Sequence, residues 1–168
     1  MSAPSRRWWG FCSPDHAGDM PSNPRQRAQR RSGPAPVPLG CGVDVVELPR
    51  LRRAIARGGA AFLNRVFTER EQAYARARRR TRLLHLAGRF AAKEAAIKAV
   101  SQVDGGRLLA MQQVEVSNDR WGRPRIILHD PLAKRIAVYI SLSHSDGVAV
   151  ASAIALRRSV AGATLLAA

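Results

Sequence analysis

Several common signatures are missing from this chain of 168 residues. No apolar run approaches the roughly 20 residues needed to cross a bilayer, and the first 20 residues lack the apolar segment of a signal peptide. Two cysteines, Cys12 and Cys41, are too few for a disulfide framework or a zinc knuckle. Walker and dinucleotide-binding glycine loops are also absent. These absences argue against membrane insertion, export and zinc-site or P-loop chemistry, and we expect a cytoplasmic protein.

Acidic residues are scarce, with 12 Asp+Glu against 28 Lys+Arg, which gives a formal net charge of +16. Residues 1–38 contain six arginines and two acids, and the remainder contains 22 bases and 10 acids. The positive charge is therefore a property of the whole chain. It favours an anionic partner, which could be nucleic acid, a phosphorylated cofactor or an acidic protein.

Composition divides the chain into a leader, one domain and a tail. Residues 1–38 are rich in Pro, Arg, Ser and Gly without periodicity, so we expect a disordered leader or an upstream start codon. Residues 39–157 are long enough for one domain with an apolar core. Residues 158–168 are interpreted as a C-terminal tail.

The domain is expected to keep its helices and strands in separate parts of the chain. This arrangement indicates an α+β fold in which a mostly antiparallel sheet packs against a long helix. Two adjacent glycines, Gly58 and Gly59, are expected to end the first helix. Thr68 and Glu71 form a capping box that predicts a helix running toward Arg80. We expect helices over 50–57 and 83–100, strands over 40–48, 112–117, 124–128, 138–143 and 148–156, and a short helical piece over 130–135.

Glu94 is the most informative position of the long helix. At about 100° per residue it lies on the apolar face, where an unpaired carboxylate needs a cation, a metal ion or a proton. Lys93 and Lys98 flank it on the helical wheel, with Arg89 beyond Lys93. The alternative is an ordinary i,i+4 ion pair between Glu94 and Lys98 on a solvated face.

A second carboxylate, Asp44, lies within an apolar strand, where both propensity and burial disfavour it. Two such carboxylates suit Mg²⁺, which takes a few carboxylate oxygens and completes its shell with waters and substrate phosphates. Lysine is rare in this chain, yet Lys93 and Lys98 both lie beside Glu94. A lysine offers a compact charge that can follow a moving phosphate.

His144 is predicted to lie at the tip of a strand, next to Ser143. A serine hydrolase is rejected, because adjacent strand residues point to opposite faces and no nucleophile elbow is present. Arginines cluster over 50–57 and 76–82. They are either solvated helix faces or binding sites for nucleotide phosphate or an acidic protein.

Five short segments form one ordered pattern, namely Gly42–Glu47, Arg65–Glu71, Gly88–Ala95, Gly122–Pro124 and Ser141–His144. Their order and spacing resemble the holo-acyl-carrier-protein synthases of the 4'-phosphopantetheinyl transferase superfamily. The resemblance extends over residues 39–156. Met111, Gln113 and Tyr139 depart from residues that are frequent in the family, and none of the three is a candidate ligand.

The resemblance implies an enzyme that transfers 4'-phosphopantetheine from coenzyme A to a serine of apo-acyl carrier protein in fatty acid biosynthesis, releasing 3',5'-ADP. It implies that Asp44 and Glu94 bind Mg²⁺ and that Glu94 and Lys98 act in catalysis. The base that accepts the serine proton is either a metal-bound water or a carboxylate such as Glu94.

The resemblance also implies contacts with the substrates and with further subunits. The residues implied are Arg89, Lys93, His144 and Arg80 for coenzyme A, and Arg50 and Arg53 for the carrier protein. A homotrimer with active sites at subunit interfaces is implied as well. Two alternatives lack catalysis: a basic nucleic-acid-binding module and a pure assembly protein.

Overall fold

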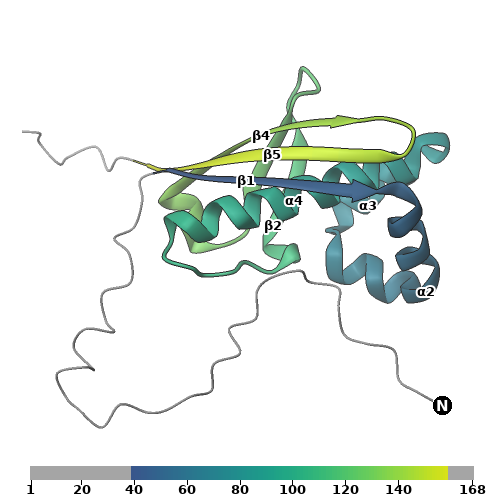
Figure 1. Cartoon of the computed structure of the whole chain (residues 1–168), viewed down its shortest axis with the longest axis horizontal. Coiled ribbons are helices and arrows are strands. Elements are labelled where there is room, and N and C mark those ends of the chain that lie inside the picture. Colours follow the sequence, from purple (N-terminus) through teal and green to yellow (C-terminus); the bar gives the residue numbers. More distant parts are fainter. Residues whose placement is uncertain (1–38, 159–168) are drawn as a thin grey trace, which may run out of the picture. The chain divides into compact units, whose positions relative to one another are not determined.

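The computed structural model describes residues 39–158, so the leader predicted for 1–38 and nearly all of the tail predicted for 158–168 lie outside the described residues. The elements carry the labels of Figure 1. In chain order they are β1 (Leu39–Glu47), α2 (Leu48–Val66), α3 (Glu69–Arg76), η1 (Arg79–Thr81), α4 (Arg82–Val103), η2 (Met111–Gln113), β2 (Val114–Asn118), β3 (Pro124–Leu128), η3 (Pro131–Lys134), β4 (Ile136–His144) and β5 (Val148–Arg157).

The strands form two antiparallel sheets. The larger sheet has the order β1-β5-β4, and β2 pairs with β3 in the smaller one. Figure 1 shows the three strands of the larger sheet running along one side of α4. The predicted α+β class, with antiparallel strands and a long helix, is confirmed. The division into two sheets is a finding of the structure.

Small side chains let the larger sheet approach α4 closely. Successive strand residues face opposite sides, so Gly40, Gly42 and Asp44 share the side of β1 that faces the helix. A β-carbon added to Gly42 would lie 2.1 Å from the carbonyl oxygen of Ala95, which leaves no space for a side chain. The facing positions of β5 are buried alanines: Ala149, Ala151, Ala153 and Ala155.

Helices α2 and α3 differ from their expected ranges. Gly59 has φ 51° and ψ −140°, so the chain kinks there, but it resumes its helical course to Val66 instead of ending at Gly58. The capping box forms as predicted, and it begins α3. The predicted extension toward Arg80 is wrong, because the backbone leaves the helical region at Arg78 (φ −114°, ψ 60°) and η1 follows.

The remaining elements lie close to their expected positions. Helix α4 is one turn longer than predicted, and β2 begins at Val114 because Met111–Gln113 form a 3-10 turn. The hairpin between β2 and β3 closes at Gly122, whose φ of 82° suits glycine. None of the helices within residues 39–158 has the length and apolar character needed to span a membrane.

Candidate functional site

Asp44 and Glu94 come from the two elements that pack most closely, β1 and α4. Glu94 is 9% exposed, and its Oε1 atom is buried without a hydrogen-bond partner among the described residues. The pKa of Glu94 is raised from 4.5 to about 7, chiefly by burial and also by the nearby charge of Asp44, whereas the charge of Lys98 acts in the opposite direction. The structure therefore brings two carboxylates together at a place where one of them lacks a partner.

Lys98 forms an ion pair with Asp44. Its Nζ atom lies 2.8 Å from Oδ1 of Asp44 and donates a second hydrogen bond, of 3.0 Å, to the carbonyl oxygen of Val43. The alternative in which Lys98 pairs with Glu94 on a solvated face does not describe this helix, because Glu94 is buried and the lysine reaches β1 instead. Because a carboxylate has two oxygens, Asp44 can hold Lys98 through Oδ1 and a cation through Oδ2.

The donor set fits a hard cation that keeps part of its shell for water and substrate. Within residues 39–158 no group of three or more His, Cys, Asp or Glu side chains could enclose a metal ion. Two carboxylates are nevertheless typical of Mg²⁺ sites that are completed by phosphate oxygens. The unpartnered oxygen of Glu94 is the observation that favours a cation at this place.

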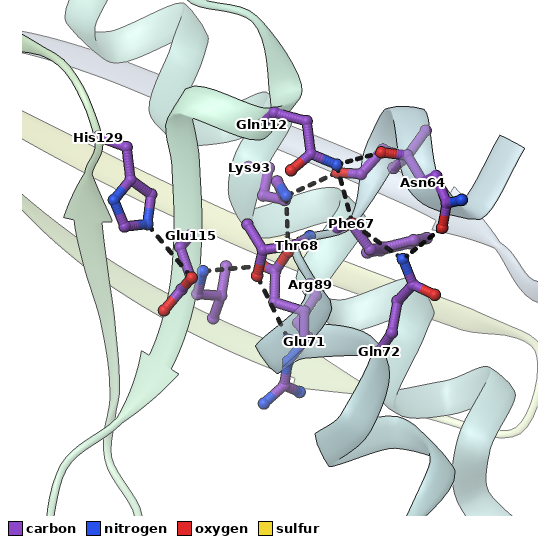
Figure 2. Close-up of polar contacts among 12 residues, drawn as sticks. Asn64, Phe67, Thr68, Glu71, Gln72, Arg89, Lys93, Gln112, Glu115 and His129 are labelled. Carbon is purple, nitrogen blue, oxygen red and sulfur yellow. Dashed lines mark hydrogen bonds and ion pairs between the residues drawn. The ribbon is translucent and has the colours of Figure 1, made fainter. Parts of the chain in front are cut away.

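Lys93, which the resemblance places near the pyrophosphate of coenzyme A, is directed away from Asp44 and Lys98 in this structure. Its side chain is 0% exposed, and its Nζ atom lies 2.6 Å from Oε2 of Glu71 and 2.6 Å from the carbonyl oxygen of Val66 (Figure 2). Burial lowers the pKa of Lys93, and the charge of Glu71 raises it. The physical reason is that α4 is buried on more than one side, so this flank meets α3 instead of solvent.

Arg89 is also buried, at 6% exposure, and it stacks on an aromatic ring. Its guanidinium carbon lies 3.8 Å from the ring centroid of Tyr74, and its Nη2 donates a hydrogen bond of 3.0 Å to Oδ1 of Asn118. Arg78 covers the same ring at 3.5 Å. Arg89 thus connects α4 to α3 and to the β2–β3 hairpin.

The other candidate residues are exposed and lie on different elements. His144 is the last residue of β4. The pKa of His85 is lowered by burial, then by the charges of Arg89 and Arg78, and least by His144, which therefore lies near His85. Arg80 lies in η1, and Arg50 and Arg53 lie on the solvent side of α2.

Two participants were missed by sequence reasoning. Glu71 was assigned only to the capping box. Its carboxylate is fully buried, forms an ion pair with Lys93 and accepts a hydrogen bond from the backbone N–H of Val116. Tyr74 is the second, because Arg78 and Arg89 both stack on its ring. The signal in the sequence was Lys93 itself, because a lysine beside the apolar face of a helix needs an acidic partner if it is buried.

The family model described as the 4'-phosphopantetheinyl transferase superfamily matches residues 40–153. Among curated proteins, the chain is 40% identical over 119 residues to the holo-[acyl-carrier-protein] synthase of Protochlamydia amoebophila, covering 69% of this chain and 96% of the relative. It is 43% identical over 122 residues to the holo-[acyl-carrier-protein] synthase of Moorella thermoacetica, covering 69% of this chain and 92% of the relative.

Solved structures agree with these relatives. The ACPS–CoA complex of Chronobacterium ammoniagenes matches with a TM-score of 0.62 at 34% identity, over 71% of this chain and 98% of that one. The Bacillus anthracis holo-(acyl-carrier-protein) synthase in complex with CoA (3',5'-ADP) matches with a TM-score of 0.57 at 34% identity. The match covers 71% of this chain and 96% of that one. These relatives lend no support to the nucleic-acid-binding alternative. The chain belongs to the holo-acyl-carrier-protein synthases of the 4'-phosphopantetheinyl transferase superfamily, the family that its motifs indicated.

Proposed function

We propose that this protein transfers 4'-phosphopantetheine from coenzyme A to a serine of an apo-acyl carrier protein in fatty acid biosynthesis, and releases 3',5'-ADP. The single observation that carries the proposal is the buried Oε1 atom of Glu94, which has no hydrogen-bond partner among residues 39–158 and lies close to Asp44, in a chain of this family. The named relatives support the reaction, and two of their structures include coenzyme A or 3',5'-ADP.

Asp44 and Glu94 would hold Mg²⁺. When bound, the ion supplies neutralising charge to the phosphoryl oxygens of coenzyme A. Glu94 would hold the ion as a carboxylate, and the charge of the ion would offset the cost of burying that carboxylate. Asp44 stays oriented because Lys98 holds its other oxygen.

The chain's own residues then act on charge and protons. The serine oxygen attacks the phosphorus that bears the pantetheine arm, and the bond from that phosphorus to the leaving oxygen of 3',5'-ADP breaks. Lys98, which is one third exposed beside Asp44, offers an ammonium to the charge that develops on this leaving oxygen. The serine proton passes to Glu94 or to water, and both acceptors fit the site.

Coenzyme A binding is assigned to exposed groups around the site. His144 at the end of β4 is proposed to approach the nucleotide, and Arg80 in η1 is proposed to serve the site of a neighbouring subunit. Arg89 is proposed to act through Tyr74 and Asn118, because its guanidinium is stacked and hydrogen-bonded inside the protein.

A homotrimer is proposed because the outer face of the larger sheet is apolar and exposed. Helix α4 runs along one side of this sheet (Figure 1). Large apolar side chains on the other side are exposed to solvent. Exposed apolar patches of this kind mark protein interfaces. The residues are Val43, Val45, Tyr139 and Ile154, which are 58%, 59%, 63% and 46% exposed.

Carrier-protein binding is proposed for Arg50 and Arg53, on the exposed side of α2. An arginine-rich helix complements an acidic protein, and the net charge of +16 speeds such an encounter at low salt. We place the reaction in the cytoplasm, where the low cysteine content fits a reducing compartment.

The test is intact-mass analysis of an apo-acyl carrier protein after incubation with this protein, coenzyme A and Mg²⁺. We expect a mass gain of one phosphopantetheine, lost with a chelator and restored by excess Mg²⁺. Asp44→Ala and Glu94→Ala should each abolish the gain while keeping a folded circular-dichroism spectrum. Transfer that persists under chelation would refute the metal site, and no transfer at all would favour the assembly-protein alternative.

A further inference from the structure

A fully buried ion pair lies on the side of α4 that faces away from Asp44. The side chains of Lys93 and Glu71 are both 0% exposed, and 2.6 Å separates Nζ from Oε2. An isolated charge at this depth would be very costly, so each partner depends on the other. Figure 2 shows the pair at the centre of a group of polar contacts between α3, α4 and the smaller sheet.

Glu71 connects three elements through one carboxylate. Its Oε2 accepts the backbone N–H of Thr68 at 2.9 Å as well as Lys93, and its Oε1 accepts the backbone N–H of Val116 at 2.8 Å. Lys93 adds a fourth connection by donating to the carbonyl oxygen of Val66 at the end of α2. The ion pair therefore fixes α4 relative to α2, α3 and β2.

Lys93 and Glu94 are consecutive, so their side chains leave α4 about 100° apart. One is directed to Glu71, and the other lies beside Asp44 of β1. Any rotation of α4 that moves Lys93 also moves the carboxylate of Glu94. The two contacts are thus mechanically coupled through the helix.

Much of the rest of the buried surface of α4 is made of small side chains, beside larger ones such as Leu86, Val100 and Val103. Side-chain ridges that interlock with grooves normally fix a helix, and alanine makes shallow ridges. Six of the fully buried residues of α4 are alanines with 0% exposure: Ala87, Ala91, Ala92, Ala95, Ala96 and Ala99. A directional ion pair adds to the orientation that these shallow alanine ridges contribute.

We propose that the Lys93–Glu71 pair is a positioning element, which sets the rotation of α4 and thereby holds Glu94 at the distance from Asp44 that Mg²⁺ requires. Lys93 does not contact coenzyme A in this assignment. The inference rests on the proposed function, because it concerns the metal site of that reaction.

The test uses Lys93→Met, Glu71→Gln and the double variant. Mg²⁺ binding is measured by calorimetry in the presence of coenzyme A, and KM for coenzyme A is measured at saturating Mg²⁺. We expect each single variant to weaken Mg²⁺ binding about tenfold or more, with KM changed less than about twofold. The double variant should show the same loss as the singles rather than their product, because the residues act as one unit.

The double variant also separates positioning from folding. Replacing both members of a buried pair with uncharged side chains of similar size often preserves stability, so this protein should stay folded while Mg²⁺ binding remains weak. Asp130→Asn is the matched control. It removes another buried carboxylate, which binds Arg107 at 2.8 Å and lies outside α4, so it should lower the melting temperature without changing Mg²⁺ binding.

Two results would overturn the assignment. A folded double variant that binds Mg²⁺ like the wild type would show that the pair only stabilises the fold. A rise in KM for coenzyme A in Lys93→Met, without a rise in Glu71→Gln, would show direct contact of Lys93 with the substrate. If the wild type neither binds Mg²⁺ nor transfers phosphopantetheine, the proposed function fails first and this inference falls with it.

Discussion

Lys98 is the cation that contacts Asp44 directly, so its removal tests the charge that we assign to the leaving group. We expect Lys98→Met to lower kcat about a hundredfold, with a smaller effect on KM for coenzyme A, because the ammonium is needed most in the transition state. The measurement is steady-state transfer to carrier protein at saturating Mg²⁺.

Lys134→Met is the control for this prediction, because Lys134 is exposed on η3 and far from the site in sequence. It should leave both constants unchanged. If both lysine variants had equal effects, the loss would reflect net charge and not a role of Lys98 at the site.

From the raised pKa of Glu94 we also predict that the stability of the ion-free protein depends on pH. Its folded pKa is about 7 and its ordinary value is 4.5, so the unfolded chain loses this proton first as the pH rises. The favourable contribution is complete below pH 4.5 and is lost as the pH rises through 7, at a cost of roughly 3 kcal/mol.

This loss is measured by urea unfolding at pH 5 and pH 8 with a chelator present. Glu94→Gln should reduce the difference between the two pH values, and Mg²⁺ should restore stability to the wild type at pH 8. An equal pH difference in wild type and Glu94→Gln would contradict the assigned pKa.

At the scale of elements, the contact between β1 and α4 depends on glycine. We expect Gly42→Ala to lower the free energy of unfolding by about 2 to 3 kcal/mol, because the added β-carbon meets the backbone of Ala95 and the elements must separate. The same separation moves Asp44 away from Glu94, so Mg²⁺ binding should weaken as well.

Gly147→Ala is the matched control for Gly42→Ala. A β-carbon at Gly147 has no atom within 4 Å, so urea unfolding should give a free energy within about 0.5 kcal/mol of the wild type. If Gly42→Ala were equally neutral, the close approach of β1 to α4 would not be essential.

The elements also show what the sequence could predict. Helical periodicity was sufficient to place Glu94 on the buried side of α4, and strand character was sufficient to identify Asp44 as an intrusive acid. The partner of Lys93 could not be found this way, because Glu71 lies 22 residues away and already had a local role in the capping box. Local patterns report propensity and amphipathicity, whereas tertiary pairing depends on how the elements are arranged in space.

The division into two sheets was missed for a related reason. Each strand was predicted from its own local pattern, but the pairing of β1 with β5 joins the two ends of the domain. Two hairpins with similar alternation give no local sign of which strands pair across such a separation.

At the scale of the whole molecule, the exposed sheet face predicts self-association. Val45→Asp places a charge at a residue that is 59% exposed, so the subunit should fold, but the proposed trimer should dissociate. Size-exclusion chromatography with light scattering gives the mass directly, and transfer activity should fall with it if the sites lie at interfaces.

Leu108→Ser provides the comparison, because Leu108 is equally exposed at 59% but lies in the loop after α4. It should keep the mass of the wild type. A wild-type protein that is monomeric at all concentrations, yet fully active, would contradict the trimer.

The proposed reaction depends on one divalent ion shared by Asp44 and Glu94, and a crystal structure with Mn²⁺ and coenzyme A tests this most directly. We predict an anomalous peak at about 2.0 to 2.3 Å from one oxygen of each carboxylate, with phosphate oxygens completing the shell. A fully occupied ion bound to coenzyme A without either carboxylate, or Asp44 and Glu94 directed away from each other, would contradict the account.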